Sequence, residues 1–226
     1  MADSLVLSLA GEPVELLGAR ALYRPRRRML LIADLHLGKA DVFRRAGIAL
    51  PAGGTGHDLE RLNALLARHP IEALWILGDL LHGPAPRATW YRHWCAWRER
   101  HPALQVVALR GNHDRALNSR ALGIEAVGEQ LEDGPFLLRH EPMPHPELHV
   151  LCGHLHPQVR LPGMTRRWPA FWLRKRLTVL PAFSHFTAGL TPALHPGEQM
   201  VACVEETVIA LPPAPERTAA SRSPSR

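Results

Sequence analysis

Residues Leu30 to Lys39 read LLIADLHLGK, an apolar run that ends abruptly in Asp-x-His and is followed by glycine and a basic residue. The run is short, apolar and flanked by polar residues, which predicts a buried β-strand. In α/β folds, ligands bind in the crevice beyond the carboxyl ends of the strands. Asp34 and His36 are two positions apart, so in extended backbone their side chains point the same way. A converging carboxylate oxygen and imidazole nitrogen suit a divalent metal ion.

Polar residues of the same kinds recur at the ends of later apolar runs. This recurrence makes chance a poor explanation for the Asp-x-His motif at Asp34 and His36. Residues in this repeated position are expected to gather along one end of the sheets. Carboxylate, imidazole and amide ligands together suit manganese, iron or zinc, and two ions about 3.5–4 Å apart clamp the oxygens of a phosphoryl displacement. Asp79 stands alone at its strand end and is the natural bridge between two ions. The later candidates are Asp79, Asn112, His113, His140, His154 and His156.

Glycines directly precede three of these candidates, at Gly78, Gly111 and Gly153. A glycine has no β-carbon, so it fits tight turns where the backbone must approach a site closely. The glycines therefore predict close contact between these loops and the ligand side chains.

Composition limits the class of protein. The 226 residues are 46% hydrophobic, which predicts one domain over residues 1–211 with a sizeable core. Residues 212–226 are mainly Pro, Ser, Ala and Arg, and are predicted to form a disordered basic tail. Three cysteines without metal-type spacing argue against a disulfide framework or a zinc knuckle. No run is long enough to cross a membrane and no signal-like segment begins the chain, so we expect a cytoplasmic protein without membrane contact.

The remaining patterns predict two sheets with different surroundings. Short alternating strands over residues 4–24 indicate a meander at a sheet edge. The second half of the chain has short strands and few helices, which predicts a second sheet. Trp90, Trp94 and Trp97 lie at helical spacing and are expected to pack in the core rather than to stack on bases. Helical patterns cover residues 39–46, 57–69 and 88–100.

Taken in order, the blocks Asp-x-His, Gly-Asp, Gly-Asn-His-Asp, a lone His and Gly-His-x-His resemble those of the calcineurin-like metallophosphoesterases. The resemblance covers about residues 30–156. It implies an α/β fold, a four-layer α-β-β-α sandwich in which two mixed sheets are flanked by helices. It also implies two divalent metal ions at the strand ends, with manganese expected and iron or zinc as alternatives.

The same resemblance implies roles for individual residues. One ion would be held by Asp34, His36, Asp79 and His156, and the other by Asp79, Asn112, His140 and His154. His113 would face the leaving group without binding metal, and Asp114 would orient it. Many members of the family have Glu where this chain has Asp114.

Three longer blocks resemble one subfamily more closely: ADLHLGK at residues 33–39, GDLLH at 78–82 and GNHDR at 111–115. With the Trp-rich helix between them, they resemble the bacterial ligase-associated DNA damage response endonucleases (PdeM). That resemblance implies a phosphodiesterase that acts as a DNA endonuclease in repair, associated with an ATP-dependent DNA ligase and other repair proteins. A small-molecule phosphatase or nucleotide pyrophosphatase with the same centre is the alternative. A non-catalytic scaffold is disfavoured because every ligand position holds a competent residue.

Basic residues close to the ligands in sequence are candidates for contact with substrate phosphates. They are Lys39, Arg44 and Arg115, and the competing interpretation is a solvated charge on a loop or helix. His82 follows Asp79 by three positions and is interpreted as a supporting or loop histidine, with a place lining the site as the alternative.

The stretch from Arg166 to Arg176 interleaves basic and aromatic residues. Basic residues contact nucleic-acid phosphates and aromatic rings stack on unpaired bases, so the stretch is a candidate nucleic-acid surface. The equal alternative is a basic loop whose aromatic residues pack onto the sheet. The candidate phosphate contacts are Arg166, Arg167, Arg174, Lys175 and Arg176.

Overall fold

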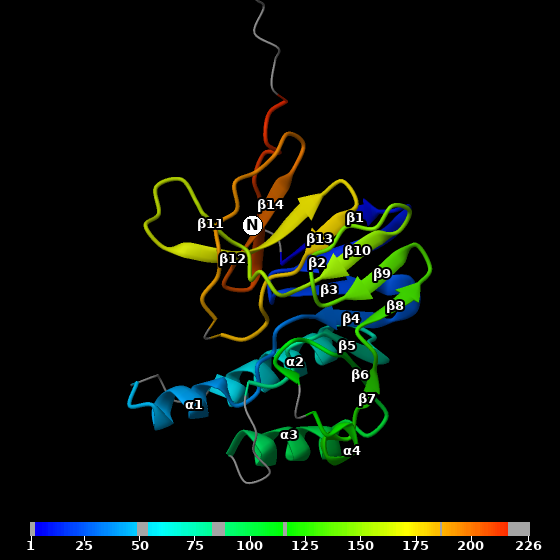
Figure 1. The fold of residues 1–226 in the computed structure, drawn as a ribbon, viewed down its shortest axis with the longest axis vertical. Coiled ribbons are helices and arrows are strands. Elements are labelled where there is room, and N and C mark those ends of the chain that lie inside the picture. Colours follow the sequence, from blue (N-terminus) through cyan, green and yellow to red (C-terminus); the bar gives the residue numbers. More distant parts are fainter. Residues whose placement is uncertain (1–2, 49–53, 83–88, 115–116, 186, 217–226) are drawn as a thin grey trace, which may run out of the picture.

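The computed structural model describes residues 3–48, 54–82, 89–114, 117–185 and 187–216. Two β-sheets lie face to face, and the helices lie to one side of the pair (Figure 1). The first sheet consists of β1 (Ser4–Leu9), β2 (Glu12–Leu17), β3 (Ala21–Arg24), β4 (Met29–Ile32), β5 (Ala73–Leu77), β6 (Gln105–Leu109) and β7 (Glu125–Val127), in that spatial order. Strands β1 to β3 form the antiparallel meander expected over residues 4–24, β4 continues it antiparallel to β3, and β4 to β7 run parallel.

The second sheet is also mixed, as predicted. Its strands are β8 (Gln130–Asp133), β9 (Phe136–Arg139), β10 (His149–Cys152), β12 (Arg167–Arg174), β13 (Leu177–Val179), β14 (Gln199–Val204) and β15 (Thr207–Ala210). Their spatial order is β15-β14-β12-β13-β10-β9-β8, and β11 (Gln158–Arg160) pairs with β12. Strands β9, β10 and β13 are parallel neighbours, whereas the other pairs are antiparallel.

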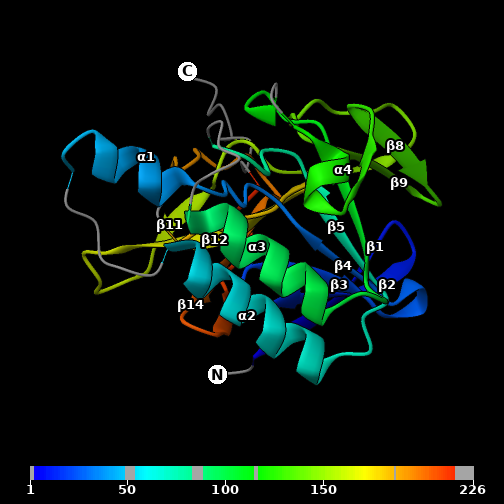
Figure 2. The same ribbon diagram turned by 90° about the horizontal axis from the view of Figure 1, so that it is seen from below.

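The described helices all precede the second sheet in the chain. They are η1 (Pro25–Arg27), α1 (Lys39–Arg45), α2 (Gly54–Arg68), α3 (Thr89–Arg100) and α4 (Ser119–Leu122). Figure 2, which is seen from the helix side, shows α2 and α3 side by side in front of the first sheet. The three predicted helices are confirmed to within a few residues. Over the outer face of the second sheet, the described chain places the apolar side chains of Leu155, Val159 and Leu194 instead of a helix.

Alternation along β4 explains how one strand serves two cores. Leu30 and Ile32 face the helices, whereas Met29 and Leu31 face the second sheet. All four are buried, and each fully buried side chain of this size contributes roughly 1.5–3 kcal/mol. The tryptophans at helical spacing pack into the helix-side core as predicted, since Trp90, Trp94 and Trp97 are buried. The apolar run at 30–33 thus anchors both layers.

Parallel pairing brings the carboxyl ends of strands from both sheets to one edge. Beyond β4, Ala33 pairs in parallel with Ala182, and the N–H of Phe183 donates to the carbonyl of Ala33 at 2.8 Å. The two sheets therefore meet where the candidate ligands leave the strands.

Cys95, Cys152 and Cys203 are free thiols, and the last two are buried as expected. Within the segment predicted to be a tail, the backbone of Ala214 forms hydrogen bonds with Gly197 and Glu198, and residues 217–226 lie outside the described residues. No described helix has the length and apolar character needed to cross a membrane.

Candidate metal centre

The backbone turns sharply where the candidate ligands leave the strands. Nine described non-glycine residues have positive φ, and five of them are candidate ligands. These are Asp34, His36, Asp79, His154 and His156, with φ between 48° and 72°. Left-handed backbone is unfavourable for such residues and persists only where the surrounding structure enforces it. The chain therefore holds these side chains in place against a local preference.

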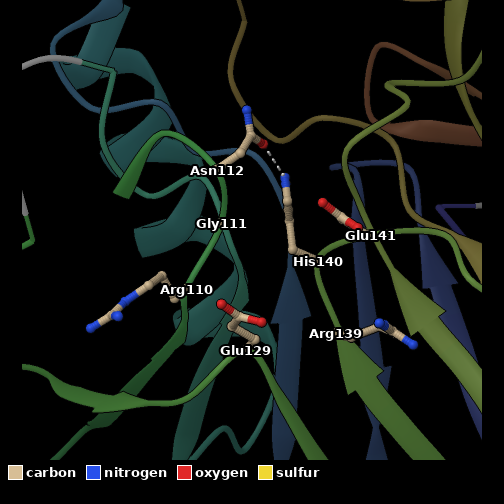
Figure 3. Close-up of a pocket in the computed structure, with 7 residues that line it drawn as sticks. All are labelled: Arg110, Gly111, Asn112, Glu129, Arg139, His140 and Glu141. Carbon is tan, nitrogen blue, oxygen red and sulfur yellow. Dashed lines mark hydrogen bonds between the residues drawn. The ribbon is translucent and has the colours of Figure 1, made fainter. Parts of the chain in front are cut away.

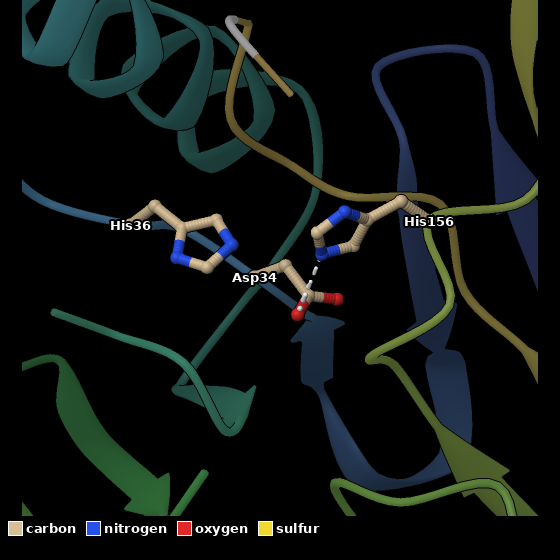
Figure 4. A group of neighbouring side chains, drawn as sticks. All are labelled: Asp34, His36 and His156. Atoms are coloured by element: carbon tan, nitrogen blue, oxygen red, sulfur yellow. Dashed lines mark ion pairs between the residues drawn. The ribbon is translucent and has the colours of Figure 1, made fainter. Parts of the chain in front are cut away.

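Asp34, His36 and His156 form the first group of candidate ligands (Figure 4). Their ligand atoms all lie within 4.8 Å of one another, and Nε2 of His156 is 3.1 Å from Oδ1 of Asp34. Oδ1 of Asp34, both ring nitrogens of His36 and Nε2 of His156 are buried without a hydrogen-bond partner among the described residues. Buried polar atoms are normally paired, so this converging set fits a divalent cation.

Nε2 of His140 is the centre of the second group. It lies 3.0 Å from Oδ1 of Asn112, 3.1 Å from Nδ1 of His154 and 3.4 Å from Oδ2 of Asp79. The other ring nitrogen, Nδ1, lies 2.9 Å from the carbonyl oxygen of Leu77 and must donate to it. That bond fixes the ring so that Nε2 faces the site, which is the arrangement found behind metal-binding histidines.

Asp34 links the two groups. It belongs to the first group and, together with Asp79 and His140, to a second set whose ligand atoms lie within 4.8 Å. Its Oδ2 also accepts a hydrogen bond from the backbone N–H of His154 at 3.0 Å. The sequence resemblance implies that Asp79 is the bridge, and the geometry adds Asp34 as a residue common to both sets.

Glycines allow the loops to approach these carboxylates. A β-carbon at Gly111 would lie 2.2 Å from Oδ1 of Asp79, and one at Gly153 would lie 2.5 Å from Oδ2 of Asp34. Gly78 is equally crowded and also has positive φ. The predicted close approach of the backbone at these three glycines is confirmed.

Burial and neighbouring charges shift the pKa values of three candidate ligands. Burial, aided by the charge of Lys39, lowers the pKa of His36 to about 2, so its ring stays neutral as a metal ligand must. Burial also lowers the pKa of His140, but its hydrogen bond to Asp79 and the charges of Asp34 and Asp79 outweigh this and raise it to about 9. Burial raises the pKa of Asp79, but hydrogen bonds from His140 and the His113 backbone bring it to about 2.

His113 lies beside both groups but is open to solvent. Its side chain is 45% exposed, and its Nε2 lies 3.9 Å from Oδ2 of Asp79. The backbone N–H of His113 donates to Oδ1 of Asp79 at 3.0 Å. Its ring stacks on His82 and meets His36 edge-on, with centroid distances of 5.3 and 5.6 Å. An exposed imidazole at this position can reach a bound substrate.

Asp114 acts on the loops rather than directly on His113. Its Oδ1 accepts a hydrogen bond from the N–H of Leu81, and its Oδ2 accepts from Gly111 and Leu80, at 2.9 to 3.3 Å. No hydrogen bond joins its carboxylate to the His113 ring in the described structure, which corrects the expected orienting contact. The backbone amides occupy both oxygens, so Asp114 ties the loop after β5 to the loop after β6.

The predicted substrate contacts have different locations. Lys39 is near Asp34 and Asp79, and burial lowers its pKa. Arg44 forms an ion pair with Asp41 at 3.0 Å and lines a separate pocket with residues of α2 and α3. Arg115 lies outside the described residues. His82, interpreted as a supporting residue, packs edge-on against His36 at 5.2 Å and against His113.

The basic stretch is divided by strand β12. Arg166 and Arg167 lie at its start, near the candidate metal centre, where they line a pocket with His156. Arg174 pairs with Leu177, which also pairs with Val150 near the start of β10. The turn at 174–177 therefore lies at the amino end of β10, opposite to the ligands that follow its carboxyl end.

Two of the three aromatic residues of this stretch pack as the alternative interpretation expected, whereas Trp168 is partly exposed beneath the guanidinium group of Arg166. Phe171 and Trp172 are buried, and Nε1 of Trp172 donates to Glu198 at 3.0 Å. Arg174 also pairs with Glu198, at 2.7 Å. An eight-residue strand spans roughly 25 Å, so the two basic ends cannot act as one compact surface.

Two pockets adjoin the candidate ligands, and sequence patterns predicted neither. One, of about 320 Å³, lies against Asn112 and His140 and is lined by Arg110, Glu129, Arg139 and Glu141 (Figure 3). The other, of about 160 Å³, lies against His156 and includes Arg20. These residues belong to no recurring motif, so no local signal could have identified them.

The chain is similar to known proteins in sequence and in structure. Residues 27–156 match the sequence model of the family described as calcineurin-like phosphoesterase. The crystal structure of the nuclease MPE from Pseudomonas putida is 38% identical, with a TM-score of 0.81, over 92% of this chain and 100% of that chain. The E. coli phosphoesterase Yfce is 19% identical, with a TM-score of 0.45, over 80% of this chain and 96% of its own. No curated protein matches the chain.

Proposed function

The chain belongs to the calcineurin-like phosphoesterase family, and we propose that it cleaves phosphodiester bonds of DNA as an endonuclease. It is a metal-dependent phosphoesterase, as its family implies. The choice of DNA is supported by the nuclease from Pseudomonas putida, which is 38% identical over nearly the whole chain. A role in repair beside an ATP-dependent DNA ligase belongs to the same proposal and rests on the subfamily resemblance.

One observation supports the proposed chemistry more than any other. Asp34 lies within ligand distance of His36 and His156 on one side and of Asp79 and His140 on the other, and an exposed histidine, His113, lies beside them. The shared ligand that the family resemblance implies is Asp79, which stands beside Asp34. In this proposal one ion is held by Asp34, His36, Asp79 and His156, and the other by Asp79, Asn112, His140 and His154. Two bound ions would neutralise charge on the phosphoryl oxygens and lower the pKa of water from about 15.7 to about 7. Manganese is the proposed metal, and iron or zinc suit the same donors.

In this proposal the chain's own residues position the substrate and protonate the leaving group. Water attacks phosphorus, the bond to the leaving oxygen breaks, and the products are a monoester and an alcohol. We assign to His113 the donation of a proton to that leaving oxygen, a step that contributes roughly 10²- to 10⁴-fold to the rate, and its exposed ring beside Asp79 supports the assignment. Asp114 holds the two loops on which Asp79 and His113 lie, and Lys39 adds positive charge beside the carboxylates.

The proposal is tested by manganese-dependent hydrolysis of three substrates: bis-p-nitrophenyl phosphate, p-nitrophenyl phosphate and single-stranded circular DNA. Wild type should cleave the diester and open the circle, and Asp79→Asn should lose both activities. Turnover of the monoester with intact circles would indicate a small-molecule phosphatase. Full binding of two metals without any turnover would contradict the enzymatic proposal.

The role of His113 is tested separately. His113→Ala should keep both metal ions, since the imidazole is not among the proposed ligands, and should lose about 10²-fold or more in kcat. Metal content by mass spectrometry and turnover of the diester are measured on the same sample. Loss of a metal ion from this variant would show that the histidine is a ligand instead.

A further inference from the structure

Among the described residues, the pocket beside His156 is lined by basic residues without acidic ones. Arg20, Arg166 and Arg167 line it, and no aspartate or glutamate is among the described residues that do. Ser184, His185 and Thr187 supply further polar groups. A concave site of about 160 Å³ lined by guanidinium groups and hydroxyls suits an oxyanion.

Positive charge is concentrated behind this pocket. Arg20 and Arg61 lie close together, and among the described residues Asp58 forms an ion pair with Arg61, with its Oδ1 2.9 Å from that guanidinium group. Glu206 also acts on Arg61 but is itself paired with Arg68. Burial, which disfavours the charged form, is the main reason that the pKa of Arg20 falls to about 10, and the charge of Arg61 lowers it further. Two guanidinium groups against one carboxylate leave an excess positive charge that a bound anion would offset.

The groups that would hold an anion are already placed. The guanidinium group of Arg20 donates to the carbonyl of Ser184 at 3.0 Å, and that of Arg166 lies over the Trp168 ring at 4.3 Å. Neither Arg166 nor Arg167 forms an ion pair with an acid in the described part of the chain. Oγ1 of Thr187 is buried and lacks a hydrogen-bond partner among the described residues.

The pocket on Asn112 and His140 differs in charge. Glu129 and Glu141 line it together with Arg110 and Arg139, so its arginines are balanced by acids (Figure 3). A phosphate would be repelled by those carboxylates, whereas the His156 pocket offers cations alone. The two sides of the centre are therefore unequal, and only the His156 side favours a second phosphate.

We propose that the His156 pocket binds the phosphate group next to the scissile one on a nucleic-acid strand. The inference rests on the proposed nuclease function, because His156 lines the pocket and also belongs to the first group of candidate ligands. A phosphate held by Arg20, Arg166 and Arg167 is then the immediate neighbour of one bound at the metal ions. The pocket makes longer strands better substrates than isolated diesters.

The test compares small substrates that differ by one phosphate. The dinucleotide TpT has one diester and no other phosphate, pTpT and TpTp add a terminal phosphate on either side, and TpTpT adds an internal one. With wild type and manganese, an added phosphate on one side should raise kcat/KM about ten- to a hundredfold. The double variant Arg166→Ala/Arg167→Ala should lose most of that gain.

A matched control is available on the same strand. Lys175→Ala/Arg176→Ala also removes two exposed charges, but from the turn at the opposite end of β12, and should keep the full gain. If both double variants keep the gain in kcat/KM, or lose it equally, the pocket is not the phosphate site. If TpTpT gains but neither pTpT nor TpTp does, the extra nucleoside matters and the proposal is wrong. A gain with a terminal phosphate alone supports the pocket and identifies a strand end as its ligand.

A binding measurement separates failure of this inference from failure of the proposed function. Fluorescence anisotropy of labelled oligothymidylate, in chelator and over a range of salt, requires no turnover. Arg166→Ala/Arg167→Ala should make the dependence of log affinity on log salt shallower by about 0.7 for each phosphate that the variant no longer binds. An unchanged slope relative to the Lys175/Arg176 control overturns the inference even if DNA is cleaved. Absence of diester hydrolysis with a changed slope overturns only the nuclease proposal.

Discussion

The two groups of candidate ligands differ in whether their polar atoms have hydrogen-bond partners within the protein. In the first group, Asp34, His36 and His156 present buried atoms that have no hydrogen-bond partner among the described residues. In the second, His140 joins Asn112 and His154 at 3.0 to 3.1 Å. The second group can therefore keep its shape through its own hydrogen bonds, whereas the first relies on a cation for stabilisation.

The largest effect is expected when one histidine is removed from either group. His36→Ala and His140→Ala should each lower diester turnover by about 10³-fold, since a metal ion supplies several kcal/mol of charge stabilisation in the transition state. Each variant should bind one metal ion where wild type binds two. Metal counting and turnover on the same preparations check this. If either variant keeps full turnover with one ion, the group that lost its histidine is not needed for the chemistry.

The same two variants should behave differently once metals are stripped with a chelator. Both histidines are 3% exposed, so the cavity left by alanine is similar. His140→Ala also removes the cation that balances Asp34 and Asp79, whereas His36→Ala removes ring nitrogens that lack partners. We expect His140→Ala to be less stable than His36→Ala by about 2–3 kcal/mol in urea unfolding. Equal unfolding free energies of the two variants would contradict the claim that the second group is stabilised by its own contacts and the first is not.

A smaller effect is expected from crowding the second group. In Gly111→Ala the new β-carbon would lie 2.2 Å from Oδ1 of Asp79, so the loop or the carboxylate must move. We expect a loss of about 2 kcal/mol in stability and weaker metal binding, read from urea unfolding and metal titration. Gly56→Ala is the control, because a β-carbon there meets no atom within 4 Å and lies in α2. Gly56→Ala should be neutral or slightly stabilising.

The smallest effect concerns a histidine buried without an acid. Burial lowers the pKa of His149 to about 4, and its Nε2 lies 2.9 Å from Oγ1 of Thr178. The pKa of His149 in the folded protein is below its unfolded value of 6.5. The stability that the neutral ring gives the folded protein is therefore fully present above pH 6.5 and is lost as the pH falls towards 4. Relative to His149→Gln, wild type should lose about 1 kcal/mol between pH 7 and 5.5, measured by urea unfolding. A pH-independent difference would contradict the lowered pKa.

Sequence patterns predicted the buried strands and the candidate ligands at their ends, and the resemblance of the ordered blocks predicted the four-layer fold, because all of these depend on local features. Apolar runs such as 30–33 mark buried strands, and the polar residues that follow them meet wherever parallel strands end together. The pocket containing Arg20 depends instead on side chains that come together from distant turns. The division of the basic stretch depends on the pairing of Arg174 with Leu177 and of Leu177 with Val150, which only the folded chain reveals. The contacts of Asp114 with backbone amides are equally non-local.

The left-handed backbone of five candidate ligands has a consequence for protein engineering. Each such residue costs roughly 1–3 kcal/mol of folding free energy, whereas glycine adopts the same conformation freely. A substitution such as His154→Gly would relieve that strain in the metal-free protein while deleting a proposed ligand. Thermostability selection on melting temperature alone would therefore favour inactive variants, and directed evolution of this scaffold must score activity at every round.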